Sequence, residues 1–145
     1  MENKMLNVKL VCVGSLKEAY LRDAVKEYEK RLGAYCRFST AELKEDSQLP
    51  DAVNVKKAYK IALCVEGKQH SSEEFAKMID KCAQVSGELV LVIGGSDGLP
   101  ESVKALCDYR LSFSKMTFPH QLMRVILLEQ LYRAFNINNN GKYHK

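Results

Sequence analysis

The residues best suited to chemistry lie in the last third of this 145-residue chain. The glycine turn Gly94-Gly95-Ser96-Asp97-Gly98-Leu99 directly follows the apolar run 88–93. Glycine lets backbone amides approach a ligand closely, and ligands of open α/β sheets collect at the carboxyl ends of strands. The sequence therefore predicts a ligand pocket at this turn. Its spacing matches neither the dinucleotide motif G-x-G-x-x-G nor the phosphate loop G-x-x-x-x-G-K-[ST], so it supports neither NAD nor ATP.

Two other polar segments of the last third could contribute to such a pocket. The loop 113–118 follows a short apolar strand, and the chain ends in Tyr143-His144-Lys145. The stretch Asn138-Asn139-Asn140-Gly141 consists of residues that favour turns. We therefore expect it to act as a hinge that lets the tail swing over the pocket.

Together, these segments resemble the bacterial ribosomal RNA large subunit methyltransferase H family, which belongs to the SPOUT class. The resemblance is carried by 94–99, 111–121, Arg124, 129–134 and 143–145, with weaker matches at 11–17 and 28–32. It implies an enzyme that uses S-adenosylmethionine to methylate N3 of a pseudouridine in 23S ribosomal RNA. It also implies a homodimer, and a SPOUT fold in which a deep trefoil knot in the C-terminal half holds the cofactor.

The resemblance also implies which residues bind the cofactor. These are Leu63, Gly94, and the loop residues Phe113, Ser114, Lys115, Met116, Thr117 and Phe118. Methyl transfer from a sulfonium requires alignment of the methyl group with its acceptor and exclusion of water, and a backbone-lined pocket suits both tasks. A side chain introduced at Gly94 is expected to fill this pocket while leaving the fold largely intact.

The methyl acceptor requires a positioned base. The target nitrogen of a uracil-type base carries a weakly acidic proton that must leave before or during attack. His144, His120 and Glu129 are the candidates for accepting it. We expect His144 to be catalytic and Tyr143 to stack on the base or close the pocket. Arg124 would position a phosphate or the base edge, or else form a structural salt bridge.

Composition limits the class of protein. A chain of 145 residues predicts a single domain spanning 1–145, and its net charge of +4 is compatible with an RNA partner without requiring one. No apolar run approaches the roughly 20 residues that cross a bilayer, so we expect a cytoplasmic protein with no membrane contact. The five cysteines form no C-x-x-C pair. They are expected to be small buried residues rather than zinc ligands, and no metal is expected.

Strand-like runs alternate with helical patterns along the chain. The predicted strands include 8–13, 35–43, 61–65 and 88–93, and the third should be closed by 66–68. This alternation predicts an α/β fold with a parallel sheet of about five strands. Knots are too rare to be predicted from such a pattern, so the knot follows from the resemblance alone.

Helical segments carry further signals. Ser71-Ser72-Glu73-Glu74 is a capping box, and an apolar stripe follows it at Phe75, Ile79, Cys82 and Val85. The helix predicted over 119–135 is apolar around most of its circumference, so it needs burial against the sheet and against a second copy of the chain. The segment 44–59 predicts at most a short helix, where the family usually has a longer charged helical segment.

A second hypothesis is a non-catalytic α/β module that binds a nucleotide-like ligand in the glycine pocket. The tail 143–145 favours the enzyme, because a binding module has no evident need for a terminal tyrosine and histidine. One small domain with a modest basic surplus offers little surface for capturing naked RNA. We therefore expect the substrate to be 23S ribosomal RNA within the assembled ribosome.

Overall fold

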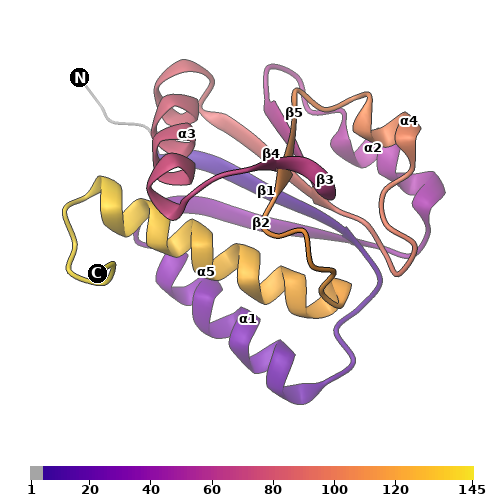
Figure 1. Cartoon of the computed structure of the whole chain (residues 1–145), viewed down its shortest axis with the longest axis horizontal. Helices are drawn as coiled ribbons and strands as arrows, with labels where there is room; N and C mark the ends of the chain where they lie inside the picture. The colour runs from indigo at the N-terminus through magenta and orange to yellow at the C-terminus, as the bar shows by residue number, and fades with distance from the viewer. Residues whose placement is uncertain (1–4) are drawn as a thin grey trace.

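The computed structural model describes residues 5–145, in which five parallel strands form one sheet in the order β2-β1-β4-β3-β5 (Figure 1). The strands are β1 (Leu6–Val13), β2 (Cys36–Leu43), β3 (Tyr59–Gln69), β4 (Glu88–Ile93) and β5 (Tyr109–Ser112). Each strand pair is parallel. The predicted α/β fold with a parallel sheet is confirmed.

Helices cover both faces of this sheet. The helices α1 (Ala19–Leu32), α3 (Ser72–Val85) and α5 (His120–Asn138) share one face, while the short helices α2 (Leu49–Val53) and α4 (Glu101–Lys104) cover the other (Figure 1). A single 3-10 turn, η1 (Asp46–Gln48), precedes α2. Within residues 5–145, no helix is long and apolar enough to cross a membrane.

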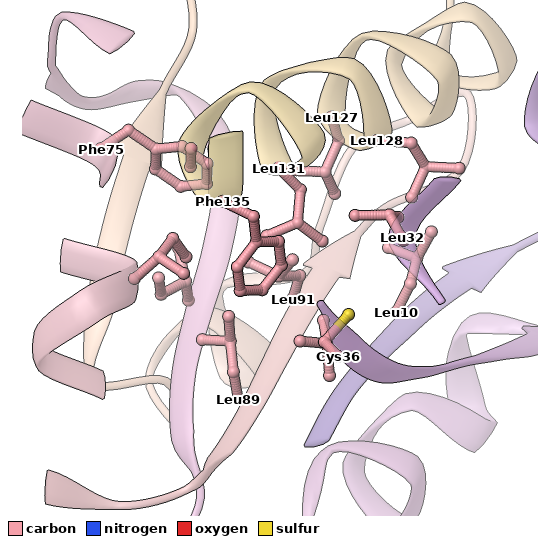
Figure 2. Close-up of a cluster of buried hydrophobic side chains, with 14 of the residues drawn as sticks. Leu10, Leu32, Cys36, Phe75, Leu89, Leu91, Leu127, Leu128, Leu131 and Phe135 are labelled. Atoms are coloured by element: carbon pink, nitrogen blue, oxygen red, sulfur yellow. The ribbon is translucent and has the colours of Figure 1, made fainter. Parts of the chain in front are cut away.

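Two apolar cores result because neighbouring side chains of a strand point to opposite faces of the sheet. Leu10 of β1 and Leu89 and Leu91 of β4 belong to the larger core, whereas Val11, Val90 and Val92 belong to the smaller one beneath α2 and α4. Figure 2 shows side chains of the larger core meeting below α5. The α5 residues labelled there are Leu127, Leu128, Leu131 and Phe135.

The capping box at the start of α3 is confirmed. The Ser71 side chain accepts a hydrogen bond from the Glu74 amide, and the Glu74 carboxylate accepts one from the Ser71 amide. Phe75, Ile79 and Cys82 are buried as predicted. The predicted burial of Val85 is wrong, because the helix ends at this residue and its side chain is 77% exposed.

The predicted end of β3 is also wrong. Instead of closing at 66–68, the strand continues to Gln69 with an irregularity in its register. Leu111 of β5 pairs with both Leu63 and Lys68 of β3. A Cβ atom at Gly67 would lie 2.7 Å from the Leu111 carbonyl carbon, so only glycine permits this approach. In Figure 1 the carboxyl half of β3 crosses β5 on its way to α3.

Candidate active site

A cavity of about 620 Å³ opens beside the middle of β3 and the carboxyl ends of β4 and β5. Its walls come from segments far apart in the sequence, which the parallel sheet places side by side. The lining segments are 63–66, 93–99, 112–114 and 116–120, together with Lys104 and Met123. All the predicted cofactor-binding residues except Lys115 line this cavity, so the structure brings together residues predicted from three separate parts of the chain.

The glycine turn is held closed by its own backbone. Gly95 and Gly98 form an isolated antiparallel bridge, and the Gly98 amide donates to the Gly95 carbonyl at 3.0 Å. A Cβ atom at Gly94 would lie 2.4 Å from the carbonyl carbon of Gly98 and 2.6 Å from the amide nitrogen of Leu99. A side chain at Gly94 would therefore meet the backbone of the turn and force the turn to move, and the expectation that the rest of the fold stays largely intact remains a prediction.

Two serine hydroxyls shape the loop between β5 and α5. The Ser112 hydroxyl donates to the carbonyl oxygen of Ser114 at 2.9 Å, and the Ser114 hydroxyl accepts from the Met116 amide at 2.9 Å. The Phe113 ring packs edge-on against Phe75, with centroids 6.0 Å apart. The ring contact holds the loop against α3, while Met116 remains 74% exposed.

An ion pair between Glu66 and Lys104 supplies charge to the cavity wall. The hydrogen bond from Lys104 holds the pKa of the Glu66 carboxyl below its usual value. Sequence reasoning missed both residues. Glu66 could have been found from the sequence, because it directly follows the predicted strand 61–65, which carries the predicted cofactor-binding residue Leu63. Nothing in the sequence indicated that α4 brings Lys104 to the same wall.

The cysteines differ in how deeply they are buried. Cys12, Cys36 and Cys82 are buried, as predicted, and burial raises the pKa of Cys36 to about 12. Cys64 is only half-buried and lines the cavity, a location that sequence reasoning missed. Across residues 5–145, no three or more His, Cys, Asp or Glu side chains lie together as a metal site.

Arg124 lies outside the cavity lining, on the side of α5 that faces β1 and β2. Its side chain is buried, and Nη1 donates to Glu42 Oε2 at 2.9 Å and to the carbonyl oxygen of Gly14 at 3.4 Å. Nε has no hydrogen-bond partner among the described residues. The structure therefore shows the salt bridge that was the alternative role for this arginine, and its catalytic role stays a prediction.

The tail packs on α3 and α5, away from the cavity of its own chain. The Tyr143 hydroxyl donates to Glu129 Oε2 at 2.7 Å, and its ring lies 4.9 Å from that of Tyr132. His144 Nε2 lies 3.0 Å from Glu73 Oε1. Glu129 comes more than two turns after His120 in α5, about 13 Å along the helix axis. Of the three candidate bases, only His120 lines the cavity.

Hydrogen bonds define the protonation states in this cluster. The Arg133 guanidinium can only donate, so its 2.9 Å contact requires an unprotonated Nδ1 on His144, and Nε2–H then donates to Glu73. Burial raises the pKa of Glu129, but hydrogen bonds from Arg133 and Tyr143 outweigh it and hold that pKa below the usual value. The bond to Glu129 raises the pKa of Tyr143 to about 12. Arg133 therefore occupies the Nδ1 lone pair of His144 in the packed tail, and the lowered pKa of Glu129 makes that carboxylate a weak base.

Comparison with known proteins identifies the family of this chain. The family model described as "Predicted SPOUT methyltransferase" matches residues 6–144. The chain is 44% identical to ribosomal RNA large subunit methyltransferase H of Clostridioides difficile, 46% to that of Clostridium novyi and 45% to that of Bifidobacterium adolescentis. Each match covers 97% of this chain and all of the relative. The two clostridial alignments extend over 160 positions, so those relatives carry residues that have no counterpart here.

Solved structures share the fold at low sequence identity. A probable methylase family protein from Haemophilus influenzae has a TM-score of 0.66 at 14% identity, over 97% of this chain and 72% of that one. The SpoU methyltransferase AviRb from Streptomyces viridochromogenes, solved in complex with S-adenosylmethionine, has a TM-score of 0.54 at 13% identity. That match covers 98% of this chain and 61% of AviRb.

Proposed function

Because the chain belongs to the SPOUT methyltransferases, and within them to the ribosomal RNA large subunit methyltransferase H family, we propose that it methylates 23S ribosomal RNA with S-adenosylmethionine as the methyl donor. The acceptor that we propose is N3 of a pseudouridine. The observation that carries the proposal is the cavity in which Leu63, Gly94 and the loop 113–118 meet. Because this is a family of enzymes, membership argues against the second hypothesis, a non-catalytic binding module.

The cavity fits the proposed cofactor in size and chemistry. A volume of about 620 Å³ lies within the range of small-molecule sites, which are largely apolar with a few polar groups. Leu63, Ile93 and Phe113 supply apolar walls, and the turn and the loop supply backbone amides and carbonyls. When bound, S-adenosylmethionine supplies an electrophilic methyl group. The protein's own task is then to align the acceptor and exclude water.

We propose His144 as the group that receives the proton of the target nitrogen. In the packed tail its Nδ1 accepts from Arg133, so the imidazole can act as a base only after the tail has left this contact. Tyr143 would stack on the target base or close the cavity. Arg124 would position the substrate indirectly, by holding the chain at the carboxyl ends of β1 and β2, where its side chain makes its hydrogen bonds. The tail must leave Glu129 and Glu73 to reach a cavity. Asn138 is the last residue of α5, so the predicted start of the hinge is wrong and the hinge would lie at 139–141.

A deep trefoil knot is part of this proposal. It is supported by the double pairing of Leu111 with Leu63 and Lys68, and by the close approach of Gly67 to the backbone of β5. Both observations fit a loop, formed by the carboxyl half of β3, through which β5 and the following chain have passed. The knot would hold the cavity's walls together without a disulfide.

A knot should shorten the contour length of the chain when the chain is fully stretched. Pulling the protein by its two termini in a single-molecule experiment should tighten the knot, because neither end can slip back through the loop. The final contour length should fall short of that of 145 fully extended residues. Tethers placed at residues 5 and 60, on a segment that ends before the loop, are the control and should show no shortfall. Full extension between the termini would contradict the knot.

Homodimerisation through the outer face of α5 is also proposed. Leu122 on this face is 37% exposed, and Ile126 and Glu129 beside it are half-buried. A second copy would cover these residues and complete the burial that the sequence of α5 requires. Two-fold symmetry would then place each tail near the partner's surface.

The dimer predicts a specific response to charge on α5. Leu122→Glu should shift sedimentation at micromolar concentration from dimer to monomer, because it buries an unpaired carboxylate at the interface. Leu106→Glu is the matched control, since Leu106 is 49% exposed on the opposite face of the sheet. A wild-type protein that sediments as an active monomer would exclude the dimer.

The proposed function is tested by methyl transfer to ribosomal particles. Ribosomes from a strain without the gene are incubated with labelled S-adenosylmethionine, and the modified nucleoside is identified by mass spectrometry. We expect a single methylated pseudouridine in 23S RNA, formed faster on the assembled ribosome than on the isolated subunit or on naked RNA. Equal turnover on naked RNA would contradict the preference for the ribosome, and no methylation of any particle would overturn the function.

A further inference from the structure

The cavity described above occupies only one side of a crevice at the edge of the sheet. At this crevice, two neighbouring strands are followed by helices on opposite faces. β1 and β4 are neighbours in the sheet, yet the chain leaves β1 toward α1 on one face and leaves β4 toward α4 on the other. Ligands of open α/β sheets bind at such a switch point, between the two departing loops. The loop after β4 is the glycine turn. The loop after β1 is Gly14–Lys17, and it does not line the cavity.

This loop stands directly beside the cavity. An ideal Cβ at Gly14 would lie 3.7 Å from Nε2 of His120, which lines the cavity wall. The Val13 side chain, one residue earlier, comes within 3.6 Å of the Cβ position of Gly95. Ser15 and Lys17 are exposed. The loop therefore offers an open surface next to the place where the methyl donor is proposed to bind.

Hydrogen bonds from two neighbouring helices hold the backbone of this loop. Arg22 Nη1 donates to the carbonyl oxygens of Leu16 at 3.0 Å and Lys17 at 2.8 Å. The Lys17 amide donates to Gln121 Oε1 at 3.0 Å, which ties the loop to the first turn of α5. These contacts fix the backbone of the loop from the α1 side and from the α5 side.

A buried arginine holds the other end of the loop. Arg124, only 4% exposed, donates to the Gly14 carbonyl and to Glu42, while its Nε–H lacks a hydrogen-bond partner among the described residues. An unsatisfied buried donor destabilises the fold, because it loses its hydrogen bond to water and gains none in return. Such a cost is typical of sites where a sequence serves function at the expense of stability.

We propose that Gly14–Lys17 is the wall that receives the target nucleotide, and that Arg22 and Arg124 are positioning residues that hold this wall in place. The inference rests on the proposed function, in which the walls built by β3, β4 and the loop 113–118 hold the methyl donor. The acceptor must then approach from the remaining flank of the crevice, where Lys17 can pair with a backbone phosphate of the RNA.

The proposal is tested at Arg22, which is exposed and holds the loop from outside the core. Arg22→Met should lower kcat/KM for ribosome methylation about 100-fold, because small displacements of a positioning surface have effects of this size. The affinity for S-adenosylmethionine, measured by calorimetry, and the Tm should stay at wild-type values. Lys26→Met, one turn further along α1, removes an equal charge from an exposed side chain without touching the loop and should stay within about twofold of wild type.

Two further variants separate positioning from charge. Arg22→Lys keeps the charge but loses the rigid guanidinium that reaches both carbonyl oxygens, so it should be nearly as impaired as Arg22→Met. Ser15→Trp adds bulk to an exposed position of the wall and should block methylation with cofactor binding intact.

Full activity of Arg22→Met and Ser15→Trp would overturn the proposal while leaving the proposed function in place. Full activity of Arg22→Lys would overturn the positioning role in favour of a simple charge contact. A wild-type enzyme that binds the cofactor but methylates no ribosomal particle would overturn the proposed function and this inference with it.

Discussion

Deleting Tyr143, His144 and Lys145 is expected to lower the single-turnover rate of methyl transfer about 100- to 10,000-fold, the usual cost of losing a general base. Affinity for S-adenosylmethionine should change little, because none of these residues lines the cavity. The fold should also persist, since the tail packs on outer surfaces, where Tyr143 contacts Glu129 of α5 and Tyr28 of α1 and His144 contacts Glu73 of α3. Calorimetry and stopped single-turnover assays with labelled cofactor measure the two quantities separately.

His144→Ala isolates the acid–base part of this effect. It should reproduce most of the loss in rate while retaining normal ribosome binding. Lys142→Ala is the matched control, because it alters the same tail at a position with no side-chain contact to Glu129 or Glu73. If His144→Ala methylates at the wild-type rate across the pH range, His144 is not the base. His120, the one candidate base that lines the cavity, would then take its place.

Gly94→Ala is expected to weaken cofactor binding about 10- to 100-fold. The added Cβ would lie 2.4 Å from the backbone of Gly98, so the turn 94–99 must open to accommodate it. Overpacking of this kind typically costs about 1–3 kcal/mol, and about 1.4 kcal/mol corresponds to a factor of ten in affinity. Because the turn forms one wall of the cavity, we expect much of that cost to appear as lost affinity for S-adenosylmethionine.

Gly95→Ala provides a control within the same turn. Its Cβ would meet the Val13 side chain at 3.6 Å, an ordinary van der Waals distance. Calorimetry should therefore show near wild-type affinity for Gly95→Ala and a clear loss for Gly94→Ala, with both proteins folded by circular dichroism. Equal affinities in the two variants would remove the closed turn from the cofactor site.

Much of the fold could be predicted because its strands are buried on both faces and its helices carry clear signals. The run 88–93 has no alternation of polar and apolar residues, as expected for a central parallel strand, and it became β4. The far end of β3 could not be predicted in this way. Its residues 66–69 are polar and include Gly67, and their strand conformation depends on contact with β5, more than 40 residues later.

The candidate site likewise contains some residues that could be predicted from the sequence and others that could not. The loop 113–118 was predicted as a continuous stretch of sequence, and all of its residues except Lys115 line the cavity. Lys104 was missed because the short helix α4 has no motif of its own and reaches the cavity only through its place against the sheet. The neighbours of Arg124 were missed because Gly14 and Glu42 lie 110 and 82 residues away in sequence.

The order in which the cavity's walls occur along the chain bears on protein synthesis. The first wall is made at residues 63–66, but the last lining residue, Met123, is added about 60 residues later. A chain that stops before this point has no complete cavity, whereas one that stops a few codons before the end has the cavity without the tail. Premature termination would thus yield products that cannot consume the methyl donor, or that hold it without completing a reaction.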